Sequence, residues 1–182
     1  MQNITNIRYL IIISFFLFLY TPSLFSQQKK AIDYYKEGLI KYNDKDFDGA
    51  KLAFEKAIEL EPKYAFAHNN YALLLSKIYK DKEAAKIHFE KALAINQKDP
   101  VTNYNYAILL MQSFSDKDNA KKHFEKAIIL NPKFANAHYF YAILLKDFFN
   151  DKDNSKKHYI SATKLDSRLS NSTLDKFFDI IR

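Results

Sequence analysis

The chain of 182 residues has a formal net charge of +7, is 48% hydrophobic and 16% aromatic, and contains two glycines, four prolines and no cysteine. This apolar content is sufficient for a packed core and excludes an intrinsically disordered chain. The scarcity of glycine and proline argues against a sheet-rich fold, whose hairpins need them, and favours helices joined by short polar turns. The lack of cysteine excludes disulfides, thiolate metal sites, catalytic thiols and a lipid-modified N-terminal cysteine.

Residues 1–26 have the pattern of a secretory signal peptide. Arg8 precedes an apolar run, Tyr9–Tyr20, and small polar residues follow it up to Ser26. A short positive region, an apolar stretch and a small-residue cleavage zone are typical of such signals. A membrane-spanning helix needs about 20 apolar residues, more than this run supplies. We therefore expect cleavage after Ser26 and a periplasmic or cell-envelope location in a bacterium. An uncleaved segment would instead tether the domain to a membrane.

A motif of 35 residues repeats along the rest of the chain. The segment His-Phe-Glu-Lys-Ala at 88–92 returns at 123–127, and Asn-Tyr-Ala at 70–72 returns at 105–107. Within each copy, apolar residues spaced by three and four predict two amphipathic helices joined by a polar turn. The predicted repeats are residues 31–64, 65–99, 100–134 and 135–169, followed by a helix in residues 170–182.

Capping signals agree with these helix boundaries. Asp99 followed by Pro100 predicts the start of a first helix, and the second helices are expected to be capped by Asp81, Asp116 and Asp151. Ser172 with Asp175 resembles a capping box for the last helix, whose apolar stripe is Leu174, Phe177, Phe178 and Ile181. We expect this helix to shield the last repeat from solvent; a partner-binding helix is the alternative.

This pattern resembles the tetratricopeptide repeat, a helix-turn-helix with small residues at its eighth, twentieth and twenty-seventh positions, an aromatic residue at the twenty-fourth and proline near the thirty-second. The third copy matches it with Ala107, Ala120, Phe124, Ala127 and Pro132. The resemblance covers nearly the whole mature chain. It implies an all-α, right-handed solenoid of four helix-turn-helix repeats with a C-terminal capping helix.

Copies two to four depart from this pattern by one extra residue in the turn between their helices. Tyr79, Phe114 and Phe149 precede the extra residue. We interpret the insertion as a local variant of the turn and not as a site.

The residue patterns do not support catalysis or metal binding. His88, His123 and His158 recur at one repeat position, so they are expected to lie in a row on helices about 8–10 Å apart. Such a row does not converge on one ion, whose ligands lie about 2.0–2.1 Å away. His68 and His138 are expected to be packing residues. With no glycine-rich phosphate loop and no nucleophile elbow, we expect no catalytic residues, no cofactor and no metal site.

The basic residues do not indicate a nucleic-acid partner. Arg168 and Arg182 are the only arginines after the signal segment, and arginine is the better reader of phosphate and base edges. Lysines recur on the second helices and are interpreted as a solvated convex face: Lys51, Lys86, Lys121 and Lys156. Electrostatic association with an anionic membrane or an acidic partner stays open.

In the tetratricopeptide-repeat family, partners usually lie along the concave face formed by the first helices. Transferred to this chain, the resemblance implies a set of partner-binding residues: Tyr35, Leu39, Tyr42, Asn69, Leu73, Lys77, Tyr104, Ile108, Met111, Tyr139, Ile143 and Lys146. Their mixture of aromatic, aliphatic and polar groups is typical of binding hot spots. Alternatively, several of the tyrosines complete the packing between repeats.

The predicted function is that of an exported protein–protein interaction adaptor or scaffold, which binds a protein or peptide segment through aromatic and apolar contacts. One subtype of the family captures chaperone C-terminal carboxylates with lysine and asparagine on this face, and that clamp is missing here. The alternative is a non-catalytic regulatory or accessory module of an envelope-associated enzyme system.

Overall fold

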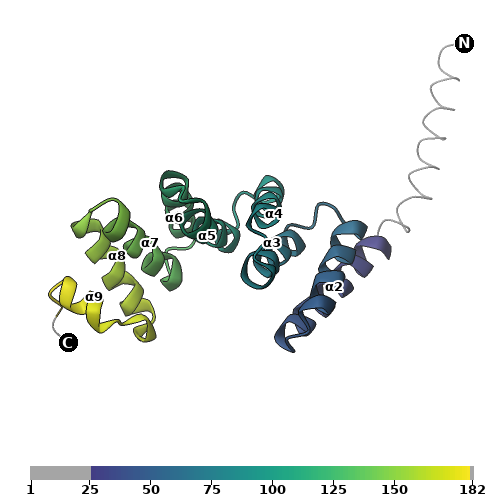
Figure 1. Ribbon diagram of the computed structural model, residues 1–182, viewed down its shortest axis with the longest axis horizontal. Coiled ribbons are helices and arrows are strands. Elements are labelled where there is room, and N and C mark those ends of the chain that lie inside the picture. Colours follow the sequence, from purple (N-terminus) through teal and green to yellow (C-terminus); the bar gives the residue numbers. More distant parts are fainter. Residues whose placement is uncertain (1–25, 181–182) are drawn as a thin grey trace, which may run out of the picture. The chain divides into compact units, whose positions relative to one another are not determined.

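The computed structural model describes residues 26–180, which form helices and no strands (Figure 1). The first helix occupies residues 26–43 of this part. It is followed by α2 (Phe47–Leu60), α3 (Ala65–Leu74), η1 (Leu75–Tyr79), α4 (Lys82–Ile95), α5 (Pro100–Leu109), η2 (Leu110–Phe114), α6 (Lys117–Leu130), α7 (Ala135–Phe148), α8 (Lys152–Leu165), η3 (Ser167–Leu169) and α9 (Ser172–Phe177). The segments η1 and η2 are π-helical, and η3 is a 3-10 turn. The chain divides into two compact units, one ending at Tyr71 and the other beginning at Ala72.

In the first unit, the helix of residues 26–43 packs closely against α2 at Gly38. A Cβ atom on Gly38 would lie 2.6 Å from two ring carbons of Phe54, whose side chain is 1% exposed. Real Cβ contacts are not this short, so only glycine allows the two helices to approach here without a shift of the ring.

In the second unit, α5 packs against α6 and α7 packs against α8, while α4 contacts α5 and α6 contacts α7. Small residues are fully buried in these helices, namely Ala107, Ala120 and Ala127, and so is the Phe124 ring. The predicted architecture of repeated helix pairs is confirmed. Small side chains let the helices approach, and the aromatic ring restores packing density.

A tyrosine–glutamate hydrogen bond joins consecutive repeats. In each case the hydroxyl of a tyrosine in a first helix donates to the glutamate of the preceding second helix, 16 residues earlier: Tyr71 to Glu55 at 2.5 Å, Tyr106 to Glu90 at 2.8 Å and Tyr141 to Glu125 at 2.6 Å. Burial, reinforced by this bond to a carboxylate, raises the pKa of Tyr106 and Tyr141. The glutamate of the recurring Phe-Glu-Lys-Ala segment therefore has a structural role.

The extra turn residue of the second and third repeats is absorbed by the π-helical segments. In the third repeat, η2 ends at a left-handed residue, Ser115 (φ 53°), and the Asp116 N–H donates to the Leu110 carbonyl, six residues earlier, at 3.1 Å. In the first repeat, which lacks the insertion, the Asp46 N–H donates to the Lys41 carbonyl, five residues earlier, at 2.9 Å. The insertion therefore stays local to the helix end.

Two of the recurring lysines stack over the turn aromatics of the next repeat. The Lys86 Nζ lies 5.1 Å from the centroid of the Phe114 ring, and the Lys121 Nζ lies 4.9 Å from that of Phe149. Both lysines are half-buried. This arrangement corrects the interpretation of these lysines as a purely solvated face, because their charges make cation–π contacts within the fold.

Aspartates cap the second helices as predicted. The Asp81, Asp116 and Asp151 side chains accept hydrogen bonds from the backbone N–H groups of α4, α6 and α8. Helix α9 differs from the prediction. Its N-cap is Asn171, whose Oδ1 accepts from two backbone N–H groups at 3.0 and 3.2 Å, and not Ser172. Asn171 takes the N-cap position because its short side chain reaches the free N–H groups of the first turn.

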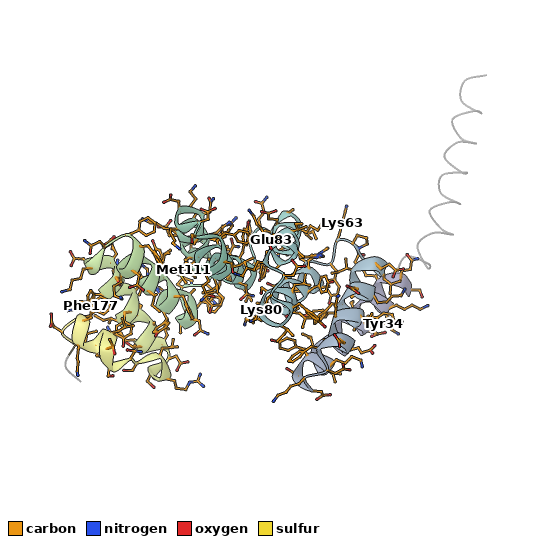
Figure 2. All side chains as sticks on the ribbon, viewed as in Figure 1. Tyr34, Lys63, Lys80, Glu83, Met111 and Phe177 are labelled. Carbon is orange, nitrogen blue, oxygen red and sulfur yellow. The ribbon has the colours of Figure 1, made fainter. Side chains whose placement is uncertain are left out.

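The terminal helix covers the end of the last repeat. Phe178 is 1% exposed and packs in a cluster with Ala142 and Tyr159, and the Tyr159 hydroxyl donates to Asp175 at 2.8 Å. Phe177, labelled in Figure 2, is 44% exposed and does not join this cluster. Ile181 of the predicted stripe lies outside the described residues.

Replacing Ala127 with leucine is expected to destabilise the fold by about 1–3 kcal/mol, because the added carbons overpack a fully buried contact between helices. The free energy of unfolding, measured by urea titration, tests this expectation. The control is Ile129→Ala in the same helix, where the side chain is 76% exposed and a change within about 0.5 kcal/mol is expected. Equal losses in both variants would contradict the assignment of Ala127 to a tight contact.

Candidate partner-binding groove

A groove of about 200 Å³ lies in the second unit, between the η1 end of the second repeat and the first helix of the third. Its lining residues are Leu73, Ser76, Lys77, Lys80, Tyr104, Asn105, Ile108, Leu109, Gln112 and Ser113. The apolar members come from regular helix, whereas five polar members lie in or next to η1 and η2. The groove therefore has an apolar part and a polar end that is formed by the two π-helical turns.

Four residues of the predicted partner-binding set line this groove: Leu73, Lys77, Tyr104 and Ile108. The polar residues Ser76, Lys80, Asn105, Gln112 and Ser113 were not predicted. Positional transfer from the family assigned Lys77 in η1 but chose Met111 in η2. The 35-residue spacing was the available signal, because it places Gln112 at the position equivalent to Lys77.

The remaining predicted residues do not line the groove. Asn69 is 4% exposed and Met111 (labelled in Figure 2) is 6% exposed, so neither presents a surface to a partner. The other six predicted residues are half-buried. Three belong to the first unit and three to α7: Tyr35, Leu39, Tyr42, Tyr139, Ile143 and Lys146.

Tyr104 contributes both to packing and to the groove. Its ring lies 4.9 Å from that of Phe134 and 6.0 Å from that of Phe140, and burial raises its pKa to about 12. Every buried polar atom among the described side chains has a hydrogen-bond partner. The Tyr104 hydroxyl makes no hydrogen bond to another described residue, so it reaches solvent. The ring is thereby fixed by its aromatic neighbours while the residue lines the groove.

The same packing occurs in the first unit, where Tyr35 lies 5.1 Å from Tyr64. The second repeat has Asn69 at the equivalent position, and the residue equivalent to Tyr64 is then Asp99, which caps α5. In the first and third repeats the inner tyrosine thus occurs together with an aromatic residue at the start of the next repeat, whereas Tyr139 has Leu169 there. This supports the alternative interpretation that tyrosines of this set complete the packing between repeats.

The histidines of the fourth repeat form a pair. The Nδ1 atoms of His138 and His158 lie 2.8 Å apart, and the His138 Nε2 lies 3.0 Å from the Pro132 carbonyl oxygen. Because a carbonyl only accepts, the His138 Nε2 carries the proton and its Nδ1 accepts from the His158 Nδ1–H. A single proton is therefore shared between the two Nδ1 atoms. No cluster of three or more metal-ligating side chains occurs between residues 26 and 180.

The environment of His158 disfavours its charged form. Burial, followed by repulsion from His138, lowers its pKa from the usual 6.5 to about 4. Lys157 lowers the pKa further, whereas Glu125 and Asp151 act in the opposite direction. The Tyr141 ring packs edge-on against it at 4.8 Å. Sequence reasoning did not find this pair, because the two histidines belong to different rows of the repeat.

Comparisons with known proteins agree with the fold. Residues 34–64 and 53–86 match two family models of the tetratricopeptide repeat. Among solved structures, MamA matches with a TM-score of 0.66 and 19% identity over 76% of this chain and 74% of that one. YrrB, described as a TPR protein with an unusual peptide-binding site, matches with a TM-score of 0.66 and 20% identity, over 81% of this chain and 75% of the YrrB chain. The first TPR of Spaghetti (RPAP3), bound to an HSP90 peptide, matches with a TM-score of 0.62 and 18% identity, over 65% of this chain and 93% of the RPAP3 chain.

A comparison with curated protein sequences gives no match. Within residues 26–180, no helix has the length and apolar character needed to cross a membrane.

Acidification is expected to weaken the fold through His158. The unfolded chain binds a proton near pH 6.5 and the folded chain only near pH 4, so stability is full above pH 6.5 and falls as the pH drops through this window. The contribution is about 1–3 kcal/mol. Urea titrations at pH 7 and near pH 4.5 measure it. In His158→Gln the loss between the two pH values should be smaller, and an equal loss would show that the pair is not responsible.

Proposed function

Because the chain is a tetratricopeptide-repeat protein, we propose that it works as an exported protein–protein interaction adaptor, whose groove in the second unit binds an extended segment of a partner protein. The observation that carries this proposal is the groove itself: it combines the exposed edge of a fixed tyrosine, Tyr104, with the aliphatic side chains of Leu73 and Ile108. Rigid aromatic and aliphatic groups of this kind anchor peptides at low entropic cost.

The shape and size of the groove favour a peptide over a small molecule. Its volume of about 200 Å³ is below the range of about 300–1,000 Å³ that is common for ligand pockets. This volume suits a few side chains of a longer chain. The description of YrrB as a protein with a peptide-binding site, and the peptide bound to the RPAP3 repeat, support the same class of ligand.

The location of the protein is part of the proposal. Its support is the N-terminal pattern of Arg8, an apolar run and small polar residues up to Ser26. An adaptor that acts in the periplasm or at the cell envelope meets its partner after export, so the groove would have to fold on that side of the membrane.

Cleavage of the signal segment has a direct readout. When the full chain is expressed in a bacterium, the mature protein is expected to begin at Gln27 and to leave the cytoplasm with the periplasmic fraction. Intact-mass measurement and fractionation test this. A full-length mass in the membrane fraction would indicate a tethered domain, and a full-length mass in the cytoplasm would contradict export.

The binding role of the groove is tested by site-specific photo-crosslinking in native cells. A crosslinker in place of the exposed Gln112 is expected to capture a partner protein, and adding Ile108→Glu should reduce the yield at least about tenfold, because a carboxylate would be buried against the partner's apolar side chain. The yield of each crosslinked species is measured by quantitative mass spectrometry.

The matched control carries Ile129→Glu, which adds the same charge to an exposed position on α6, outside the groove. It should leave the yield unchanged. Circular dichroism melting checks that both variants fold. Equal yields with and without Ile108→Glu would refute binding at this groove.

A further inference from the structure

We infer that the groove selects a partner segment carrying an aspartate or glutamate, which is held at the η1–η2 end while an adjacent apolar side chain packs on Leu73 and Ile108. This inference rests on the proposed function and adds the chemistry of the partner to it. The alternative is a segment with asparagine or glutamine at the same position. Such a segment has no charge for the lysines to attract.

The charge at this end of the groove is one-sided. Lys77 and Lys80 line it, and no aspartate or glutamate is among the lining residues. Both lysines are exposed, and Lys80 (labelled in Figure 2) follows η1 in the left-handed conformation, with a φ of 60°. The Lys80 Nζ donates to the Lys77 carbonyl at 2.7 Å, which holds its charge close to the turn. Two lysines without a facing carboxylate attract a negatively charged group.

The aspartates that follow the two π-helical turns do not neutralise these lysines. The Asp81 Oδ1 accepts from the Ala84 N–H at 3.0 Å and caps α4. Asp116 accepts from the backbone and side chain of Asn119 at 3.2 and 2.8 Å, and the side-chain bond lowers its pKa. Both carboxylates cap the helices that follow, and neither forms an ion pair with Lys77 or Lys80, so these two ammonium groups can approach a ligand.

Neutral hydrogen-bond donors complete the polar end. Gln112 and Ser113, which belong to η2, both line the groove, and neither side chain makes a hydrogen bond to another described residue. The Ser76 hydroxyl donates to the Leu73 carbonyl at 3.1 Å, which satisfies it internally. A carboxylate has two acceptor oxygens, so an ammonium group and an amide or hydroxyl donor can bind it together.

The inserted residue is responsible for this arrangement. Lys77 lies inside η1, and Gln112 and Ser113 lie inside η2, the two segments where each helix widens before the turn. Widening of a helix by a π-turn is often associated with a functional site. Here both neighbouring repeats carry the insertion, and their two π-helical turns contribute side chains to the same groove.

The experiment selects random decapeptides displayed on phage against the purified mature protein. Peptides that bind are expected to be enriched in aspartate or glutamate next to a leucine, isoleucine or phenylalanine. In the best synthetic peptide, exchange of the acid for its amide should raise the Kd about tenfold, as expected for loss of a charge-assisted hydrogen bond. The double variant Lys77→Gln, Lys80→Gln should bind both peptides equally.

A charge-matched control, Lys98→Gln with Lys133→Gln, removes two exposed lysines that do not line the groove and should keep the preference for the acid. Peptides that bind at the groove without acid enrichment would overturn the inference and leave the proposed function standing. A preference for the acid that survives in the Lys77 and Lys80 variant would also overturn it. The proposed function itself would be contradicted if the Ile108→Glu variant still bound every selected peptide, or if no peptide were selected.

Discussion

The fold depends on a steric constraint, the close approach of helices that is possible only where side chains are small. Ala107, Ala120 and Ala127 are fully buried at these approaches, and at Gly38 a Cβ would collide with the Phe54 ring. One helix pair cannot bury its apolar face alone, so each repeat must stack on the next. The stacking is made specific by polar contacts of fixed spacing, the tyrosine–glutamate hydrogen bonds. A shift in register would separate each buried tyrosine from its carboxylate partner.

The residue inserted in repeats two to four accompanies two features of the structure. At the turns, Phe114 and Phe149 lie under the Lys86 and Lys121 ammonium groups, so part of the lysine charge is used within the fold. In repeats two and three, the helix ends widen into η1 and η2, which provide the polar end of the groove. The insertion is therefore tolerated because it gains a cation–π contact and a closing hydrogen bond from Asp116 to Leu110.

The fold could be predicted from the sequence because its determinants are local and repeated. Small residues at fixed spacing, Asp81, Asp116 and Asp151 at the turns, and Pro100 after Asp99 each specify a helix contact or a helix start. The candidate site could be predicted only in part. Met111 was assigned to the inner face but is buried, and the groove is lined instead by Gln112, which lies 35 residues after Lys77. The pairing of His138 with His158 was not predicted, because it joins two rows of the repeat.

Tyr104 shows how packing and binding depend on each other in this groove. Its ring is held by Phe134 and Phe140, so it has little rotamer freedom left to lose when a partner covers its exposed edge. The lysines at the polar end are exposed, and their attraction is long-ranged and weakened by salt. The two parts of the groove therefore have different roles: the charged end directs an acidic segment toward the groove, and the rigid apolar part retains it. A partner that lacks either feature loses a distinct part of the recognition, the rate of association in one case and the lifetime of the complex in the other.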